Sequence, residues 1–361
     1  MGCTYIMKRI LFLTDHLGGG GAPISILALA STLAGYGCSV TIVSLQDKVW
    51  HDPPEGVNIQ VLRFTYRGPW QKYRRYHIHA LRLNDWIDNQ ANPFDLIVAN
   101  MHYSHQVAIR SCLRDRAWLC IRTDPGAELA GSRRSGRLAR LRHLYHGRRV
   151  LCISKGILDS LHALDIVPAE TQVIHNIIDA SAIQLAMQKP VSYEDFIVFV
   201  GRLDRRQKRY DRLFKAYKQS GISQCLVVVG DGELDEAKVL AGSLGIADRV
   251  VFVGKQSNPY PYIYHARLLV LSSDYEGFGR VIAESLVCGT PVVSTDCPSG
   301  PREILKGKLS TCLVPLDDGE ALSRRMAELI DNPPAIDPAY YSAYTPDNIV
   351  DQYLHLLDRD G

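Results

Sequence analysis

The chain has 361 residues, of which 46% are hydrophobic and 22% are charged, with 41 Lys and Arg against 38 Asp and Glu. This length indicates about two domains, and the composition excludes a largely disordered chain. A net charge of +3 is too small for a typical nucleic-acid-binding protein, so we expect no nucleic acid as a partner.

Short apolar runs alternate with helical patterns through the first half of the chain. The run at residues 10–13 is followed by glycines at 18–21 and by apolar residues at helical spacing over 24–33. Continuous apolar strands that alternate with amphipathic helices are typical of a parallel sheet covered on both faces. Further strands are predicted at residues 40–43, 59–62, 96–99, 118–121, 150–153 and 171–174.

The same alternation restarts after a break. Residues 187–194 lack the pattern and indicate a linker. Beyond it, small or polar residues follow each predicted strand, and ligands of open α/β sheets bind outside such carboxyl ends. The last predicted element is an amphipathic helix at 346–357, capped by Asp347 or Asn348. The strands of this half are predicted at residues 196–200, 226–229, 250–253, 268–271 and 291–294.

These elements predict an α/β protein of two Rossmann-like domains that face each other across a cleft. We place the domains at residues 1–188 and 189–345, with a C-terminal helix at 346–361 that crosses back to the first domain. The nine cysteines are scattered without a C-x-x-C pair or metal-ligand spacing, and several stand in apolar runs. Without a secretory leader or a long apolar run, we expect reduced thiols in a cytoplasmic protein.

One segment, residues 272–291, combines acids, glycines and the start of a helix. A strand ends at Leu271 and a helix begins near Gly279, so Glu276 lies in the loop and Glu284 in the helix. Backbone N–H groups at a helix N-terminus, left open by Gly277 and Gly279, suit anions and hydroxyls. Carboxylates accept hydrogen bonds from sugar diols. The pair therefore points to sugar binding, although an isolated pair of acids is more often a loop acid and a solvated helix residue.

Two cations follow the first strand of the second half. Arg202 comes directly after residues 196–200, and Lys208 lies a short loop later. Cations at the mouth of a parallel sheet suit a diphosphate, because Arg offers a planar bidentate fork and Lys a point charge. Taken alone, residues 205–209 are more typical of a solvated basic turn.

The combination of these motifs resembles the C-terminal domain of retaining GT-B glycosyltransferases of family 4. The resemblance is strong over residues 196–305 and weaker over the N-terminal half. In the second half it rests on Gly201-Arg202-Leu203, Lys208, Gly230-Asp-Gly232, Asn258-Pro-Tyr260, the E-x7-E pair Glu276 and Glu284, and residues 294–305. In the first half it rests on Gly18–Gly21, Ser154-Lys-Gly156 and residues 175–179.

The resemblance implies a hexosyltransferase that uses a nucleoside diphosphate sugar, most commonly UDP-linked, and retains the anomeric configuration. The acceptor would be a glycan or glycolipid hydroxyl in cell-surface polysaccharide or lipopolysaccharide synthesis, with no metal or other cofactor. Arg202 and Lys208 would hold the diphosphate, Glu284 the ribose, and Glu276 a hydroxyl of the donor sugar. The remaining donor-binding residues that it implies are Gly19, Gly20, Gly201, Gly254, Gly277, Phe278 and Gly279.

The catalytic residue of the N-terminal domain is open. The family often has a histidine after a central strand of that domain, and residues 121–126 have none. Asp124 and His105 are the rival candidates, and for the histidine a surface or capping role is the plainer interpretation. The glycines at 18–21 fail the dinucleotide fingerprint G-x-G-x-x-G, which disfavours a dehydrogenase.

Basic residues concentrate in the first half of the chain. Eleven arginines lie between Arg110 and Arg149, and residues 67–76 mix basic residues with Trp70 and two tyrosines. This pattern indicates contact with an anionic inner-membrane surface, with a solvated arginine-rich helix at residues 132–147 as an equal alternative. For the whole protein, the alternatives to a transferase are a nucleotide-sugar epimerase of the same fold and a non-catalytic nucleotide-sugar-binding protein.

Overall fold

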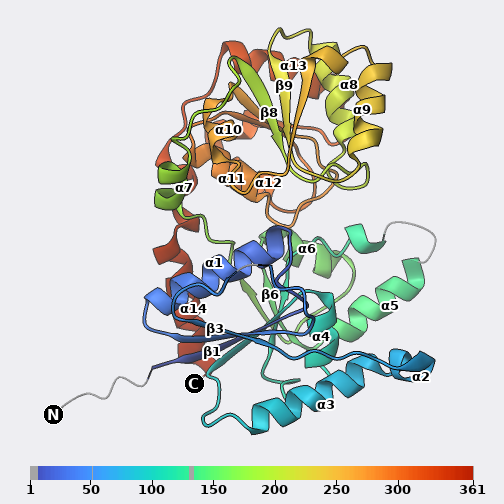
Figure 1. The fold of residues 1–361 in the computed structure, drawn as a ribbon, viewed down its shortest axis with the longest axis vertical. Helices are drawn as coiled ribbons and strands as arrows, with labels where there is room; N and C mark the ends of the chain where they lie inside the picture. Colours follow the sequence, from blue (N-terminus) through green and yellow to red (C-terminus); the bar gives the residue numbers. More distant parts are fainter. Residues whose placement is uncertain (1–6, 51, 130–133, 361) are drawn as a thin grey trace, which may run out of the picture. The chain divides into compact units, whose positions relative to one another are not determined.

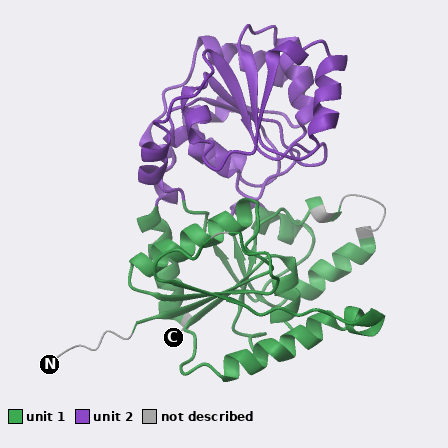
Figure 2. Ribbon diagram, in the orientation of Figure 1, with its two compact units in different colours: residues 1–153, 157–177, 346–361 green, residues 154–156, 178–345 purple. Residues whose placement is uncertain are grey.

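The computed structural model describes residues 7–50, 52–129 and 134–360. The chain forms two compact units, each built on its own parallel sheet (Figure 2). Unit 1 consists of residues 1–153, 157–177 and 346–361, and unit 2 of residues 154–156 and 178–345. Within the described ranges, no helix has both the length and the apolar character needed to cross a bilayer.

Unit 1 contains a seven-stranded parallel sheet in the order β3-β2-β1-β4-β5-β6-β7 (Figure 1). Its central strand β4 is buried along its whole length, which explains the continuous apolar pattern of such segments. The strands confirm those that we predicted for this half: β1 (Arg9–Thr14), β2 (Ser39–Ser44), β3 (Val57–Val61), β4 (Leu96–Asn100), β5 (Trp118–Ile121), β6 (Arg149–Cys152) and β7 (Glu170–Val173).

The C-terminal helix α14 (Pro346–Asp360) belongs to unit 1, as predicted. It contacts α1 and β4, and it buries Val350 and Tyr353. The predicted arginine-rich helix is α5, and residues 132 and 133 of that prediction lie outside the described ranges. The other helices here are α1 (Gly21–Gly35), α2 (Gly68–Tyr73), α3 (Arg75–Asp88), α4 (His102–Ala108), α5 (Arg134–Tyr145) and α6 (Lys155–Ala163).

Unit 2 contains a six-stranded parallel sheet in the order β10-β9-β8-β11-β12-β13. The strands β8 (Phe196–Val200), β9 (Cys225–Val229), β10 (Val250–Gly254), β11 (Leu268–Leu271) and β12 (Val292–Thr295) were predicted, and the two-residue β13 (Leu313–Val314) was not. The helices are α7 (Ala180–Ala186), α8 (Tyr210–Ser220), α9 (Leu234–Ser243), α10 (Tyr260–His265), α11 (Arg280–Val287), α12 (Pro301–Ile304) and α13 (Gly319–Asp331).

The position of α7 corrects the predicted domain boundary at residue 188. The helix is capped by Asp179, whose side chain accepts from the Ala182 N–H at 2.9 Å. It packs on α10 and α11 through the buried Ile183 and so forms part of unit 2. Unit 2 therefore takes in residues 178–188, which we had assigned to the first domain. A seven-residue helix is too short to show a clear apolar period.

In each sheet the direction of strand addition reverses at one pair of neighbouring strands. In unit 1 the chain adds β2 and β3 on one side of β1 and β4 to β7 on the other, so β1 and β4 flank the switch point. In unit 2 the corresponding pair is β8 and β11. Open α/β sheets bind ligands outside the carboxyl ends of such strands. The loops that follow these four strands are therefore the places to look for a site.

Candidate functional site

The predicted site residues of unit 2 follow the two strands that flank its switch point. Arg202 and Lys208 lie in the loop after β8, and Glu276 lies in the loop after β11. The two strands are parallel neighbours, with Leu268 paired to Ile197. Because both strands point the same way, the two loops leave the same edge of the sheet.

The Lys208–Glu276 ion pair joins these two loops. Lys208 Nζ lies 2.6 Å from Glu276 Oε1, and the two side chains are only 17% and 8% exposed. The buried Ser273 hydroxyl donates to the same carboxylate oxygen at 2.7 Å. Removing one partner of a buried ion pair leaves an uncompensated charge, which costs about 3–5 kcal/mol. A positive and a negative group thus stand side by side at the switch point.

Asp204 organises the loop that carries both cations, and the sequence analysis missed it. Its Oδ1 accepts from the N–H groups of Gln207 at 2.5 Å and Lys208 at 3.3 Å, and its Oδ2 from Arg202 Nε at 2.9 Å. Burial raises the pKa of Asp204, but these hydrogen bonds outweigh it and lower the pKa overall. An Asp that accepts from the N–H three residues on is typical of a tight turn. The Arg202 side chain itself is 64% exposed.

Two glycines bring the loop after β9 against the loop that carries Arg202. The backbones of Leu203 and Gly232 form a parallel bridge. A Cβ at Gly230 (φ 157°) would overlap the carbonyl oxygen of Gly201, and one at Gly232 (φ 121°) that of Leu203. Only glycine permits so close an approach of two backbones. The motif Gly230-Asp-Gly232 thus helps to fix the backbone position of Arg202.

Glu284 is a buried and paired carboxylate rather than a solvated helix residue. It is 8% exposed, and its Oε1 accepts from an Arg280 guanidinium nitrogen at 2.9 Å within α11. Burial, followed by the Glu284 charge, raises the pKa of Tyr260 to about 12. The helix is preceded by Gly279 in the left-handed region (φ 79°), which explains the glycine there.

The other predicted donor-binding residues of unit 2 differ in how far they are buried. Gly254 ends β10 with φ 71°, at the same carboxyl edge of the sheet, and Gly277 is half-buried. The Phe278 side chain is 2% exposed and packs edge-on against Tyr344, with ring centroids 5.0 Å apart. A Cβ at Gly300 would overlap the Phe278 carbonyl oxygen. The Phe278 side chain therefore supports the loop.

His105 lies in the core of unit 1, which corrects the catalytic role we considered for it. It is 2% exposed, with Nδ1 3.1 Å from the Tyr145 hydroxyl and Nε2 3.0 Å from the Ala99 carbonyl oxygen. Burial lowers its pKa to about 3, so the ring stays neutral at physiological pH. Both nitrogens are occupied by the fold, so neither is available for proton transfer to a substrate.

Asp124 also has a structural position. It is 3% exposed, and its Oδ1 accepts from the Ala127 N–H at 3.1 Å and the Ser160 hydroxyl at 3.0 Å. These bonds tie the loop after β5 to α6. Asp124 Oδ1 therefore holds this loop, and the catalytic role considered for the residue stays a prediction.

The glycine loop after β1 is open. Gly19 is half-buried and Gly20 is exposed, and Gly20 has φ 119°, a conformation that only glycine adopts readily. A Cβ at Gly20 or Gly21 would meet no atom within 4 Å. The loop therefore has room for a ligand to approach its backbone.

Asp15, which the sequence analysis missed, ties the end of β1 to α4. Its carboxylate accepts from the N–H groups of Tyr103 at 3.0 Å and Ser104 at 2.6 Å. Burial raises its pKa to about 6, although these hydrogen bonds act in the opposite direction. Asp15 follows β1 and α4 follows β4, so these two hydrogen bonds join the segments on either side of the switch point of unit 1.

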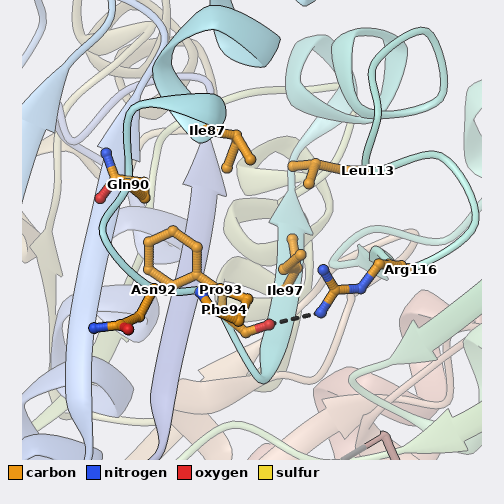
Figure 3. A pocket seen from close by; sticks show the side chains of 8 residues that line it. All are labelled: Ile87, Gln90, Asn92, Pro93, Phe94, Ile97, Leu113 and Arg116. Carbon is orange, nitrogen blue, oxygen red and sulfur yellow. Dashed lines mark hydrogen bonds between the residues drawn. The ribbon is translucent and has the colours of Figure 1, made fainter.

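A pocket of about 230 Å³ in unit 1 lies at the other end of the sheet. Figure 3 shows Phe94 and Ile97, which are close to the amino end of β4, with the Arg116 guanidinium donating to the Phe94 carbonyl oxygen at 2.7 Å. None of the predicted site residues lines it. Its position at the amino end of a parallel strand separates it from the site edge of the sheet.

Two family models together account for most of the chain. Residues 19–182 match the model of Glycosyltransferase Family 4, and residues 185–346 match that of glycosyl transferases group 1. These matches confirm the resemblance to glycosyltransferases of family 4 that the sequence motifs indicated. The chain belongs to glycosyltransferase family 4.

Individual relatives agree with this assignment. An N-acetylgalactosamine-N,N'-diacetylbacillosaminyl-diphospho-undecaprenol 4-alpha-N-acetylgalactosaminyltransferase of Campylobacter jejuni is 32% identical over 51% of this chain and 51% of its own length. The chain thus aligns with about half of that relative. The lipopolysaccharide core biosynthesis glycosyltransferase LpsE of Rhizobium meliloti is 25% identical over 95% of this chain and 97% of its own.

The solved structure of Anabaena HepE in complex with UDP and glucose superposes with a TM-score of 0.75 at 22% identity. The match covers 98% of this chain and 100% of the other. It confirms the predicted GT-B fold class, in which both domains are Rossmann-like.

Proposed function

We propose that the protein transfers the hexose of a UDP-hexose donor to a hydroxyl group of a lipid-linked glycan, with retention of the anomeric configuration. The observation that carries this proposal is the buried Lys208–Glu276 pair at the switch point of unit 2, with Nζ and Oε1 2.6 Å apart. Lys208 and the exposed Arg202 bind the diphosphate, Glu276 accepts a hydrogen bond from a donor sugar hydroxyl, and Glu284 binds the ribose.

The two cations also act in the chemical step. As the bond between the anomeric carbon and the diphosphate oxygen breaks, negative charge grows on the leaving group. Preorganised cations stabilise such charge, and the removal of a single group of this kind typically lowers kcat by about 10²–10³-fold. Positive charge is supplied here by Arg202 and Lys208, so we expect the reaction to proceed without a metal ion.

Retention is proposed to follow from attack on the face that the diphosphate leaves. Glu276 is the acid paired with Lys208, and its Oε1 already accepts from Lys208 and from Ser273. A carboxylate held in this way is a weak nucleophile. The acceptor hydroxyl therefore attacks directly, and its proton passes to an oxygen of the departing diphosphate.

The names of related proteins support the donor and the acceptor. The Anabaena structure contains UDP and glucose, the Campylobacter relative is named for a diphospho-undecaprenol acceptor, and the Rhizobium relative for lipopolysaccharide core biosynthesis. We therefore place the enzyme in lipopolysaccharide or cell-surface polysaccharide synthesis at the cytoplasmic face of the membrane. None of the eight described cysteines forms a disulfide, which fits a reducing compartment.

Peripheral contact with an anionic membrane surface is part of the same proposal. Helix α2 buries none of its residues, and Trp70 and Tyr73 are 65% and 86% exposed beside Lys72 and Arg74. Exposed aromatic rings among basic residues are typical of helices that lie in the membrane interface. Co-sedimentation with phosphatidylglycerol vesicles should be strong at low salt and lost at high salt. No sedimentation at low salt would contradict the membrane contact.

The transfer reaction can be tested with labelled UDP-glucose, UDP-galactose and UDP-N-acetylglucosamine and an extract of lipid-linked glycans. We expect label to enter the lipid fraction with one of these donors and the Lys208→Ala variant to abolish incorporation. Lys215→Ala, in the neighbouring helix α8, is the matched control and should remain active. Donor conversion without acceptor, or undiminished transfer by Lys208→Ala, would contradict the proposal.

A further inference from the structure

The switch point of unit 1 carries a second group of cations. The chain leaves β4 into α4, whose first residue His102 is half-buried at the carboxyl edge of the sheet. Helix α3 packs on α4, and α5 reaches α4 through the hydrogen bond between Tyr145 and His105. The three helices are therefore linked to one another through α4.

Three arginines, one from each of these segments, act on His102 or on its neighbour Gln106. After burial, the charges of Arg140 and then Arg75 lower the pKa of His102, so both guanidinium groups act on this ring. Arg110, just beyond α4, donates to Gln106 Oε1 at 2.7 Å, and Gln106 Nε2 lies 3.4 Å from His102 Nε2. We call Arg75, Arg110 and Arg140 the unit 1 cation cluster.

Aromatic rings and hydrogen bonds hold two members of the cluster, Arg75 and Arg110, in place. The Arg110 guanidinium lies 5.6 Å from the centre of the Tyr76 ring, and Arg75 donates to the Tyr76 hydroxyl at 2.9 Å. The Tyr76 ring packs against Tyr103, with centroids 5.0 Å apart. Arg75 and Arg110 are half-buried and held by these contacts, and Arg140 is exposed.

Among the described side chains, no carboxylate pairs with any of the three arginines. The sequence contains no Asp or Glu between Glu55 and Asp85, and none between Asp95 and Asp115. The buried Asp15 instead accepts from backbone N–H groups of α4. Some other arginines of unit 1 do pair with a carboxylate, as Arg149 does with Glu170 at 3.1 Å. Like charges held together without a counterion repel each other, and a bound anion relieves this repulsion.

We propose that the unit 1 cation cluster binds the phosphate or diphosphate group of the acceptor. This inference rests on the proposed function, in which the acceptor is lipid-linked, and it assigns the acceptor's charged group to unit 1. Three guanidinium groups from three segments suit an anion with several oxygens, because each planar fork pairs with two of them. A single carboxylate would leave at least one arginine without a partner.

Isothermal titration of the full chain with geranyl diphosphate tests the assignment directly. We expect the wild-type protein to bind it, and each of Arg75→Gln, Arg110→Gln and Arg140→Gln to weaken binding by about tenfold. The triple variant should show no measurable binding. Arg142→Gln, two residues along α5, is the matched control and should bind like the wild type, because Arg142 faces Asp165 instead.

Further titrations identify the source of the phosphate and distinguish binding at the unit 1 cation cluster from binding at the donor site. Geraniol should not bind. Tighter binding of geranyl diphosphate than of inorganic pyrophosphate supports a lipid acceptor, whereas equal binding supports the phosphate site but assigns it to a free diphosphate. Lys208→Ala should retain geranyl diphosphate binding, so a failed donor site does not affect this result. The proposal is overturned if the wild type does not bind geranyl diphosphate, or if the folded triple variant binds it as tightly as the wild type.

Discussion

The switch points of the two sheets use charge in opposite ways. In unit 2, Lys208 from the loop after β8 pairs with Glu276 from the loop after β11, at 2.6 Å and largely out of water. In unit 1, the acid at the switch point, Asp15, is tied to backbone N–H groups, and the cations around His102 have no carboxylate partner among the described residues. A paired site suits a ligand with both phosphate and hydroxyl groups, and an unpaired one suits an anion.

The largest expected effect concerns the paired site. Lys208→Met should lower kcat by at least about 10²-fold through the loss of leaving-group stabilisation. It should also lower the free energy of unfolding by about 3–5 kcal/mol, because Glu276 is left buried without its partner. The double variant Lys208→Met/Glu276→Gln should recover most of the stability and none of the activity. Urea unfolding and a transfer assay measure the two effects; recovery of activity together with stability would contradict a catalytic role for the lysine.

The glycine loops of the two units should differ in their tolerance of a methyl group. Gly230→Ala should lower the free energy of unfolding by about 2–4 kcal/mol, because the Cβ overlaps the Gly201 carbonyl oxygen. Gly21→Ala, where a Cβ meets nothing within 4 Å, should change it by less than about 0.5 kcal/mol. Equal effects in thermal unfolding would mean that the unit 2 loops are not packed as described.

Acid should lower the stability of unit 1, because His105 binds a proton more readily in the unfolded chain than in the folded one. The pKa of His105 is about 3 in the folded protein because of burial, below its usual 6.5, so its contribution to stability is complete above pH 6.5 and falls as the pH drops towards 3. At pH 5 this loss amounts to about 2 kcal/mol. Asp15, with its pKa raised to about 6, acts in the opposite direction.

The variant His105→Gln isolates this contribution, because Asp15 is unchanged in it. Urea unfolding at pH 7.5 and pH 5.0 should show a smaller loss of stability on acidification for the variant than for the wild type. The same loss in both proteins would show that His105 is protonated in the folded state.

The smallest predicted effect concerns Glu284. Glu284→Ala should raise KM for the donor by about tenfold and leave kcat nearly unchanged, because the ribose is bound equally in the ground and transition states. Glu320→Ala is the matched control, since this exposed helix residue also pairs with an arginine four positions away, at 3.8 Å. A fall in kcat with unchanged KM would contradict ribose binding by Glu284 and would indicate a role in the chemical step instead.

Most of the fold could be predicted from the sequence because its strands are buried on both faces. Such strands are continuous apolar runs, and glycine or polar residues mark their ends, as Gly201 does after β8. The strand β13 escaped prediction because two residues carry no period. Helix α7 escaped for a related reason, since only Ile183 of its seven residues is buried.

The candidate site was only partly predictable. Glu276 and Lys208 were found because their spacing matches a family motif, whereas Asp204 and Asp15 hold backbone N–H groups that no motif marks. The buried positions of His105 and Asp124 were not predicted, because a sequence gives the end of a strand but not the direction in which a side chain points. In both cases the side chain turns inward to bond groups of its own unit.

The central claim is that the paired site of unit 2 binds the donor diphosphate. Titration of UDP into the wild type and into Lys208→Met/Glu276→Gln, both shown to be folded, tests it most directly. We predict micromolar-range binding by the wild type and at least about 100-fold weaker binding by the double variant, since charge-assisted contacts to phosphate are lost. UDP binding of equal strength in the two proteins would contradict the claim.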